Sequence, residues 1–359
     1  MEQWTYSQIR DKLLVHGRTQ ETEEGLSFNW TCAGVTVSFT GKVLQVRLRV
    51  EDGCPWIAAA DETGRLFYRQ SCQTSGDWYT LWRASVPGRY TVRLVRLTEN
   101  TQGRLTLLAV ACDGALHYPI APRLRIEFVG DSITCGYGNE ANSPLEHFLP
   151  RHENGWQTAC AQAARTLCAD WSCVAVSGIT VSAGKYKNTY HARTVSMEQL
   201  YCYTDLPTDR ARQRAPDVWR FSAHPVDAVV VNLGTNDEDM LIAAQSRQQM
   251  QAERAFFRQR YRALLKQIRR YNGPLPWIVC TLGPLRYALW DDILCAADEY
   301  HCRTGDTRVL CRKLSPLEPE KEGLGGDGHP TLFTHTRMGR ELAAILAPLL
   351  QQQISASDV

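Results

Sequence analysis

Apolar and polar residues alternate in short runs along the first third of the chain. The alternating runs occupy residues 26–30, 35–39, 43–50 and 90–95. Glycines and aspartates separate the runs, Gly41 and Gly88 among them. Because successive side chains of a strand point to opposite faces of a sheet, this period of two is typical of half-buried antiparallel strands. It predicts that residues 1–118 form an antiparallel β-sandwich of jelly-roll type.

The pattern changes after residue 118, where continuous apolar runs replace the alternation. Runs typical of buried strands occupy residues 126–129, 173–176, 228–233, 277–282 and 309–311. Stretches with helical periodicity lie around residues 156–167, 248–271, 291–303 and 335–351. In the last stretch, Met338, Leu342 and Leu346 fall on one face, as a helix packed on a sheet requires. Strands that alternate with helices predict a doubly wound α/β domain with a parallel sheet over residues 119–359.

The length of the chain indicates two domains, and its charge indicates which partners are not expected. A chain of 359 residues, 44% of them hydrophobic, is long enough for two ordinary cores. The formal net charge of +2 provides no strong field to attract nucleic acid or an anionic membrane. We therefore expect neither kind of partner, and the sequence specifies no oligomeric state.

The cysteines and the N-terminus indicate a reducing compartment. The thirteen cysteines are an odd number and include no Cys-x-x-Cys pair, which is typical of buried free thiols. The first residues have no apolar segment that could serve as a signal peptide, and no run reaches the ~18 apolar residues that a membrane span needs. We expect a cytoplasmic protein, and a secreted protein whose leader has been removed is the alternative.

Polar loops follow the predicted parallel strands, where the chemistry of such sheets is normally located. The first loop contains Gly130-Asp131-Ser132, the second Gly178, and the third Asn236, while His329 lies just before the last helix. Each residue alone has an ordinary explanation, such as a helix cap for the serine or a turn for the glycine. Their arrival in this order at equivalent positions is much more specific and indicates an enzyme.

This arrangement resembles the SGNH or GDSL-type hydrolase superfamily, whose four blocks are headed by Ser, Gly, Asn and His. Ser132, Gly178, Asn236 and His329 match these four in turn. The preceding β-sandwich, the sequence Gly-Asp-Ser-Ile-Thr-Cys-Gly-Tyr-Gly from residue 130 and the form Asp-x-His-Pro at residue 327 are similar to carbohydrate esterase family 2. The resemblance covers nearly the whole chain. It implies removal of acetyl groups from plant-type polysaccharides or their oligosaccharides, such as mannan, glucomannan or xylan fragments.

The catalytic roles follow from residue chemistry together with the resemblance. A serine hydroxyl attacks an ester only if a base takes its proton, and His329 would be that base for Ser132. Asp327 would hold the imidazole if the segment between them is extended, because residues two apart then project to the same side. If the loop is tightly turned, a backbone carbonyl orients the imidazole and Asp327 becomes secondary.

The backbone N–H groups of Ser132 and Gly178 and the side-chain amide of Asn236 are the oxyanion donors that the resemblance implies. This chemistry needs no cofactor and no metal, and the other histidines lack the spacing of a metal site. For His335, six positions after His329, we expect a capping or surface role.

Sugar contacts are expected from aromatic residues, which stack on the apolar faces of sugars. Tyr137, Tyr186, Tyr190 and Trp290 are the candidates, and the polar stretch 180–223 would form part of a cleft wall. The leading hypothesis is a carbohydrate acetyl esterase. A lipase, thioesterase or other acylesterase of the same fold is the first alternative, and a carbohydrate-binding protein with an inert hydrolase half is the second.

Overall fold

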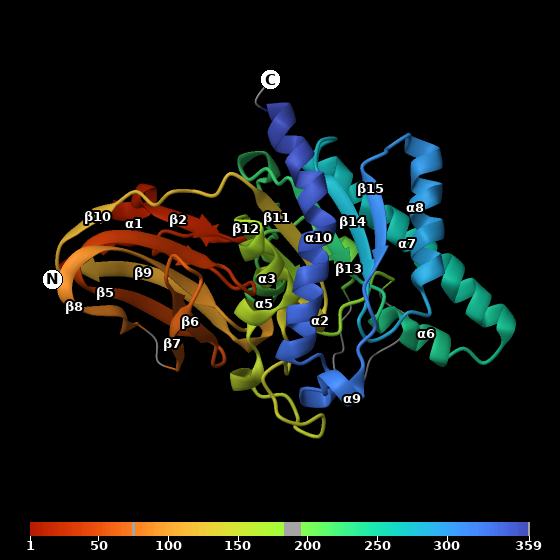
Figure 1. The fold of residues 1–359 in the computed structure, drawn as a ribbon, viewed down its shortest axis with the longest axis horizontal. Coiled ribbons are helices and arrows are strands. Elements are labelled where there is room, and N and C mark those ends of the chain that lie inside the picture. The colour runs from red at the N-terminus through yellow and green to blue at the C-terminus, as the bar shows by residue number, and fades with distance from the viewer. Residues whose placement is uncertain (74–75, 183–194, 358–359) are drawn as a thin grey trace.

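The computed structural model describes residues 1–73, 76–182 and 195–357. Figure 1 shows two regions side by side, one built of antiparallel strands and one in which helices cover a parallel sheet. The antiparallel region comes first along the chain, and both predicted fold types are confirmed. In the described part of the chain, no helix is long and apolar enough to cross a membrane.

The antiparallel region is a ten-stranded sheet among the described residues. Its main path runs β3-β4-β9-β5-β8-β6-β7, while β1 pairs with β9, and β2 and β10 pair with β5. The strands are β1 (Glu2–Thr5), β2 (Leu13–His16), β3 (Gln20–Glu21), β4 (Leu26–Ser27), β5 (Gly34–Glu51), β6 (Trp56–Ala60), β7 (Leu66–Ser71), β8 (Asp77–Arg96), β9 (Arg104–Cys112) and β10 (Ala115–His117). The short helix α1 (Tyr6–Ile9) connects β1 to the rest.

Two glycines that were expected to separate strands lie inside strands. Gly41 and Gly88 are paired with each other within β5 and β8, which are 18 and 20 residues long. The register shifts between Gly41 and Val43, as at a β-bulge. A bulge bends a strand and increases its twist without ending it, so one long strand replaces two short ones here.

The second region is built on a five-stranded parallel sheet in the order β12-β11-β13-β14-β15. Its strands are β11 (Arg125–Gly130), β12 (Asp170–Ala175), β13 (Ala228–Asn232), β14 (Trp277–Leu282) and β15 (Val309–Lys313). All five predicted strands are therefore confirmed within a few residues. The strand order changes direction next to β11, so the loops after β11, β12 and β13 lie beside one another.

Helices cover both faces of this sheet (Figure 1). The long ones are α3 (Ala159–Thr166), α7 (Arg247–Asn272), α8 (Trp290–Thr304) and α10 (Leu332–Ser357), and the short ones are α2 (Ser132–Cys135), α4 (Met197–Leu200), α5 (Leu206–Ala211), α6 (Asp239–Ile242) and α9 (Pro319–Glu322). Phe128 and Val230 pack in one core with α3 and α10, while their neighbours Val129 and Val231 pack in the other with α7 and α8. Residues next to each other in a strand thus serve opposite faces, as the pleat requires.

A buried arginine joins the two regions. Arg18 lies between β2 and β3, and its guanidinium donates to both carboxylate oxygens of Glu127 on β11, at 3.0 and 2.9 Å. The ion pair is enclosed, with side-chain exposures of 0% and 3%. The rings of Tyr201 and Phe221 lie 4.8 and 4.9 Å from the guanidinium carbon, so aromatic faces cover the charge.

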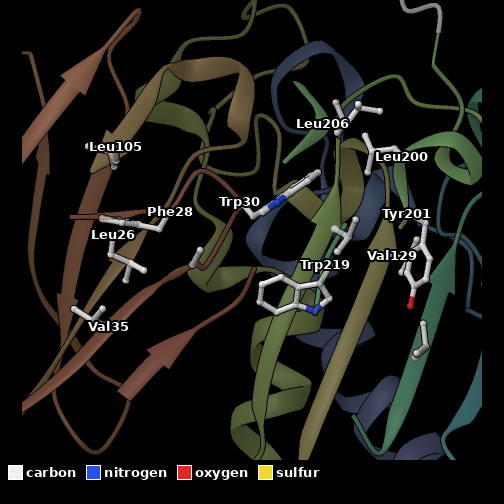
Figure 2. Packing of buried hydrophobic residues seen from close by; sticks show 14 of the residues in the cluster. Leu26, Phe28, Trp30, Val35, Leu105, Val129, Leu200, Tyr201, Leu206 and Trp219 are labelled. Carbon is white, nitrogen blue, oxygen red and sulfur yellow. The ribbon is translucent and has the colours of Figure 1, made fainter. Parts of the chain in front are cut away.

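Of the stretch expected to form part of a cleft wall, the segment from residue 195 to residue 223 packs between the two regions, and residues 183–194 lie outside the described residues. Trp30 of the sandwich donates its indole N–H to the backbone carbonyl of Thr204 at 2.7 Å, and Figure 2 shows it pointing toward the group of Leu200, Leu206 and Trp219. The buried apolar side chains of this segment fill the space between a sandwich and a sheet.

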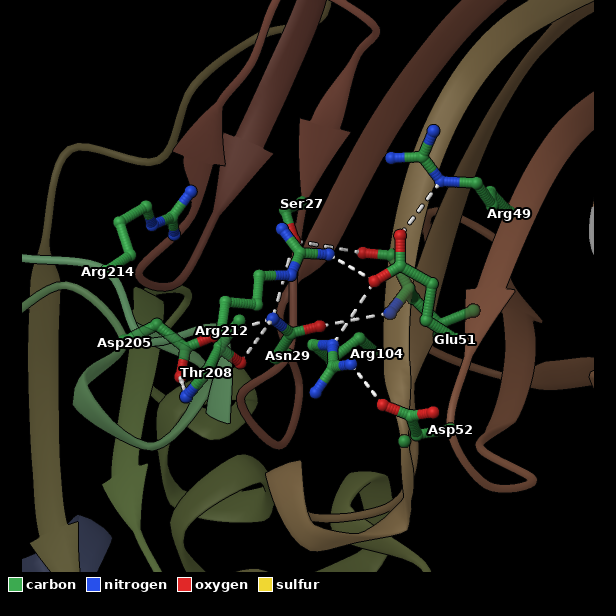
Figure 3. A network of polar contacts seen from close by, with 12 residues as sticks. Ser27, Asn29, Arg49, Glu51, Asp52, Arg104, Asp205, Thr208, Arg212 and Arg214 are labelled. Atoms are coloured by element: carbon green, nitrogen blue, oxygen red, sulfur yellow. Dashed lines mark hydrogen bonds and ion pairs between the residues drawn. The ribbon is translucent and has the colours of Figure 1, made fainter. Parts of the chain in front are cut away.

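Polar contacts line the edge of the same interface (Figure 3). Asn29 donates to the carboxylate of Asp205 at 2.6 Å, and Arg212 pairs with Glu51 of β5. Arg104 of β9 also pairs with Glu51, so one carboxylate is shared by an arginine from each region. The interface therefore encloses the Arg18–Glu127 ion pair among apolar side chains and has further ion pairs at its edge.

Candidate active site

The four residues selected from the sequence gather at the carboxyl edge of the parallel sheet. Ser132 directly follows β11, Gly178 follows β12 and Asn236 follows β13. Because β12 and β13 flank β11, the loops of Gly178 and Asn236 lie on either side of the serine. His329 reaches the same place from the loop before α10.

Ser132 and His329 are in hydrogen-bond contact although 197 positions separate them. The Nε2 atom of His329 lies 2.9 Å from Ser132 Oγ. The other ring nitrogen, Nδ1, lies 3.1 Å from the backbone carbonyl oxygen of Gly326. Since that carbonyl can only accept, it favours the tautomer that carries hydrogen on Nδ1 and leaves Nε2 free to accept the serine proton.

A tight turn presents the serine hydroxyl. Ser132 begins the short helix α2, and the Asp131 side chain before it accepts the N–H of Ile133 at 3.0 Å. A Cβ atom on Gly130 would lie 1.9 Å from the Thr134 hydroxyl oxygen, so only glycine fits at the end of β11. The Gly-Asp-Ser sequence thus supplies the space, the cap and the hydroxyl in that order.

The Asp327 carboxylate is turned away from the histidine. Its oxygens accept the Tyr137 hydroxyl at 3.0 Å and the Phe148 backbone N–H at 3.0 Å, and lie 3.0 Å from Nδ1 of His147. The backbone of Asp327 is left-handed, with φ 50° and ψ 32°, inside a 3-10 turn that spans Gly326–Gly328. The segment is therefore tightly turned and not extended, so the orienting oxygen beside the ring is the carbonyl of Gly326.

Aromatic rings support the histidine from one side. The ring of Tyr137 lies 4.4 Å from that of His329, and the ring of Phe148 lies 4.3 Å from Tyr137 on a nearly parallel plane. The bond to Asp327 holds the Tyr137 hydroxyl, and together with burial it raises the pKa of this phenol. Asp327 thus ties the loop of residues 142–150 to the histidine loop through His147 and Phe148, and holds Tyr137 beside the histidine ring.

The surroundings keep His329 neutral and Asp327 charged. Burial lowers the pKa of His329, against the opposite effect of the Gly326 carbonyl and of the Asp327 charge. Burial also tends to raise the pKa of Asp327, but the hydrogen bonds from His147, Tyr137 and Phe148 outweigh it and lower that pKa. A neutral imidazole with a free Nε2 is the form a general base requires.

The loop of residues 177–182, which carries Gly178, is held by buried polar groups. The carboxylate of Asp237 accepts the backbone N–H groups of Val181 and Ser182 at 3.1 and 2.9 Å. Burial raises the pKa of Asp237, and these donors oppose that effect. No local pattern in the sequence points to this contact, because the partner loop lies 55 positions away.

The side-chain amide of Asn236 faces the same loop. Its Nδ2 donates to the Ile179 backbone carbonyl at 3.0 Å and to an oxygen of Asp131 at 3.3 Å. Burial and the nearby charge of Asp237 raise the pKa of Asp131, to about 7. Asn236 therefore links the serine loop to the loop of Gly178.

The expected backbone donors are unengaged. Within the described residues, the N–H groups of Ser132 and Gly178 donate to no acceptor. For Ser132 this follows from its place at the first position of a helix, where N–H groups have no partner one turn earlier. Gly178 has φ 75°, a conformation that glycine adopts without strain.

Two further expectations concern histidines and metals. His335 is fully buried and its Nδ1 accepts the N–H of Ala159, the first residue of α3, at 3.2 Å. It caps a neighbouring helix and is not at the surface, and burial lowers its pKa to about 3. The residues that the structure describes include no group of three or more His, Cys, Asp or Glu side chains that could hold a metal ion.

The aromatic residues named for sugar binding have different surroundings. Tyr137 is covered by Phe148 on one side and His329 on the other. Trp290 is the first residue of α8 and packs against the hydrophobic core. Tyr186 and Tyr190 lie outside the described residues. Beside the histidine, a Cβ on Gly328 would meet nothing within 4 Å, so this side of the site is open.

Two family models match the chain. Residues 128–332 match the GDSL-like lipase/acylhydrolase family, and residues 15–122 match the N-terminal domain of carbohydrate esterase family 2. The four loops described above lie within the first match, and the sandwich accounts for the second.

Two characterised relatives cover most of the chain. The cellulase/esterase CelE of Acetivibrio thermocellus is 30% identical over 342 residues, which are 92% of this chain and 39% of CelE. An acetylxylan esterase / glucomannan deacetylase of Cellvibrio japonicus is 24% identical over 94% of this chain and 88% of its own length. The chain thus spans about two fifths of the first relative and most of the second.

Solved structures show the same two-domain arrangement. A family two carbohydrate esterase from Clostridium thermocellum, solved in complex with cellohexaose, has a TM-score of 0.83 at 28% identity and covers 94% of this chain and 99% of its own. The acetyl xylan esterase Est2A from the rumen bacterium Butyrivibrio proteoclasticus has a TM-score of 0.87 at 22% identity over 98% of both chains, a likeness of fold. The chain therefore belongs to the GDSL-like lipase/acylhydrolase family and joins that family's hydrolase domain to the N-terminal domain of the family 2 carbohydrate esterases.

Proposed function

We propose that this protein removes acetyl groups from carbohydrates, with Ser132 as nucleophile and His329 as general base. The 2.9 Å contact between Ser132 Oγ and His329 Nε2 carries the proposal, because it pairs a hydroxyl with a base that can take its proton. The family two sandwich and the relatives that act on acetylated xylan and glucomannan support a carbohydrate substrate.

In the first half of the reaction, Ser132 Oγ attacks the acetyl carbonyl carbon while its proton passes to His329 Nε2. The carbonyl oxygen becomes an oxyanion, which we expect the N–H groups of Ser132 and Gly178 and the amide of Asn236 to stabilise. The bond to the sugar oxygen then breaks, and His329 returns the proton to that oxygen. The sugar leaves with a free hydroxyl, and the acetyl group stays on the serine.

Water completes the cycle by the same route. It attacks the acetyl-serine carbonyl while one of its protons passes to His329 Nε2. The serine–acyl bond breaks, the proton returns to Ser132 Oγ, and acetic acid leaves and ionises. Throughout, Nδ1 of His329 keeps its hydrogen bond to the Gly326 carbonyl, which stabilises the transient imidazolium.

The Asn236 amide has to exchange a partner to serve as an oxyanion donor. Both its hydrogens are engaged, and the bond to Asp131, at 3.3 Å, is longer than the bond to Ile179, at 3.0 Å. The longer bond is the weaker one, and an oxyanion is a better acceptor than a carboxyl whose pKa is raised to about 7. We therefore expect the substrate oxyanion to replace Asp131.

The experiment is acetate release from acetylated glucomannan and acetylated xylan, with para-nitrophenyl esters of increasing chain length alongside. The proposal expects acetate release that disappears in Ser132→Ala while glycan binding remains. A preference for long acyl chains would instead indicate a lipase or thioesterase. Binding of acetylated glycan without any turnover in the unmodified protein would indicate a carbohydrate-binding protein.

A further inference from the structure

Glu99 belongs to the sandwich but is buried against the hydrolase loops. It lies just beyond the end of β8, before the 3-10 turn Asn100–Gln102, and only 1% of its surface is exposed. None of the four motif blocks includes it, and nothing in the proposed mechanism uses it. A buried acid at this depth needs partners to offset its lost hydration.

The hydrogen bonds of the Glu99 side chain are with two segments of the site. Its Oε2 accepts the backbone N–H of Ser177 at 2.8 Å and lies 3.7 Å from the Cys135 thiol. Ser177 is the residue before Gly178, and Cys135 ends the helix that Ser132 begins. One carboxylate oxygen from the sandwich therefore lies between the two chain segments whose N–H groups are the backbone oxyanion donors.

Contacts from both regions hold Glu99 in this position. Arg96 of β8 donates to the Glu99 backbone carbonyl at 2.6 Å and to the carbonyl of Gly103 at 2.8 Å. The Glu99 backbone N–H donates to the Glu153 carboxyl at 3.0 Å. Backbone contacts on both sides of the residue leave the side chain little freedom to move away from Ser177.

Glu99 has a second buried acid beside it. Burial, and then the charge of Glu99, raise the pKa of Glu153 well above its ordinary value. A raised pKa favours the neutral form of Glu153. The thiol of Cys135 faces the same pair, and its pKa is raised by burial and by both glutamates.

We infer that Glu99 is a positioning residue for the oxyanion donor Gly178, so that the sandwich completes the esterase site. The inference rests on the proposed function. Glu99 fixes the start of the loop of residues 177–182, as Asp237 fixes its end at Val181 and Ser182. A donor held at both ends meets a developing oxyanion without first having to reorganise.

The charge of Glu99 also acts on the histidine. It is one of the charges that raise the pKa of His329 against the larger effect of burial, together with that of Asp327. Buried His335 also faces His329. Glu99 thus has two separable properties: an oxygen that reaches Ser177 and a charge felt at the imidazole.

Two substitutions separate these properties. Glu99→Asp keeps the charge but shortens the side chain by one methylene, so that it no longer reaches Ser177. We expect the Gly178 N–H to shift once Ser177 is released. A shift of about 1 Å at a catalytic group lowers kcat about 100-fold, and KM should change little. Glu99→Gln keeps an oxygen in place but removes the charge. We expect a smaller loss of kcat and an acid limb of kcat/KM that moves to lower pH, because the imidazolium loses a stabilising charge.

Glu153→Gln is the matched control, because it replaces a neutral acid by a neutral amide of the same shape. It keeps an oxygen for the Glu99 N–H, so kcat and the acid limb should stay as in the unmodified protein. All three variants are melted in parallel to establish that they are folded. A purely structural role for Glu99 would lower the melting temperature without changing kcat or the acid limb of the folded variants.

A titration that needs no turnover keeps this inference distinct from the proposed function. Histidine labelled with ¹³C at Cε1 is titrated by NMR, and the His329 signal is assigned with a His329→Gln variant. The expected result is a lower His329 pKa in Glu99→Gln only. An unmodified protein without esterase activity would defeat the proposed function. Unchanged kcat in folded Glu99→Asp, together with an unshifted His329 in Glu99→Gln, would overturn the role of Glu99.

Discussion

The two loops that meet at Ser132 are held by opposite means. The loop of residues 325–329 orients its catalytic histidine with a backbone carbonyl, and its one carboxylate, Asp327, holds side chains at the rim. The loop of residues 177–182 has no catalytic side chain of its own. Carboxylates from elsewhere, Asp237 and Glu99, hold its backbone.

The difference shows that the acids named here hold the backbone and the rim by hydrogen bonds, whereas the hydrogen bond of the histidine Nδ1 goes to a backbone carbonyl. A carbonyl dipole is a weaker partner for an imidazolium than a carboxylate, so the histidine depends more on burial and on the ring of Tyr137. The oxyanion loop, in contrast, needs a rigid backbone, and a buried carboxylate that accepts two N–H groups supplies rigidity. The following predictions test this division, from the largest expected effect to the smallest.

His329→Ala should have the largest effect, because it removes the only base beside Ser132 in the described structure. We expect kcat for acetate release to fall by about 10⁶-fold, as in other enzymes that lose this member of the pair. Stopped assays on para-nitrophenyl acetate measure the loss, with the slow background hydrolysis subtracted. A residual rate within tenfold of the unmodified protein would show that another group takes the serine proton.

Asn236→Ala should come next, since it removes one oxyanion donor and leaves the serine and the histidine in place. The expected loss is about 10²–10³ in kcat, with little change in KM. The melting temperature serves as the control, because Asn236 also bonds to Ile179 and Asp131. Full activity in the variant would mean that the amide keeps its present partners during the reaction.

Asp237→Asn tests the loop of residues 177–182, whose backbone is held by carboxylates. Only one oxygen remains to accept the N–H groups of Val181 and Ser182, and the new amide hydrogens face donors. We expect kcat to fall about 100-fold through the displaced loop, and the free energy of unfolding to fall by about 1–3 kcal/mol. Kinetics and chemical denaturation of the same preparation measure both. A change in stability alone would separate Asp237 from the oxyanion site.

Asp327→Asn tests the loop of residues 325–329, whose histidine is oriented by a backbone carbonyl, and should have a small effect on kcat. A carboxylate that orients a catalytic histidine is worth about 10⁴ in kcat. Because the Gly326 carbonyl holds the imidazole here, we expect kcat to fall by less than about tenfold. This loss would come from the weaker hydrogen bonds that hold Tyr137 and Phe148. A loss near 10⁴ would show that the carboxylate turns to the histidine during catalysis.

The pH profile provides the finest test. Burial lowers the pKa of His329, and the protonated imidazole cannot act as a base. Activity is therefore retained as pH falls through the ordinary histidine pKa of about 6.5 and is lost only below it. The acid limb of kcat/KM against pH measures this position. An acid limb above that value would mean that the charges of Asp327 and Glu99 outweigh burial.

The sequence alone determined the two folds and the members of the site. Alternation with period two and continuous apolar runs are local signals, so the change from antiparallel strands to an α/β domain could be read along the chain. The loops of Ser132, Gly178 and Asn236 could also be selected, because each follows a strand of the same sheet and equivalent ends must meet at one edge, and His329 precedes the last helix.

Tertiary structure decided what the sequence left open or misplaced. Gly41 became a bulge because a paired strand continued through it, and Asp327 turned to Tyr137 because its own backbone is left-handed. Glu99 joined the site across a domain boundary, 78 positions from Ser177. Local patterns record which face of an element is buried, but the partner of a buried polar group depends on which distant segment packs against it, and only the folded chain specifies that.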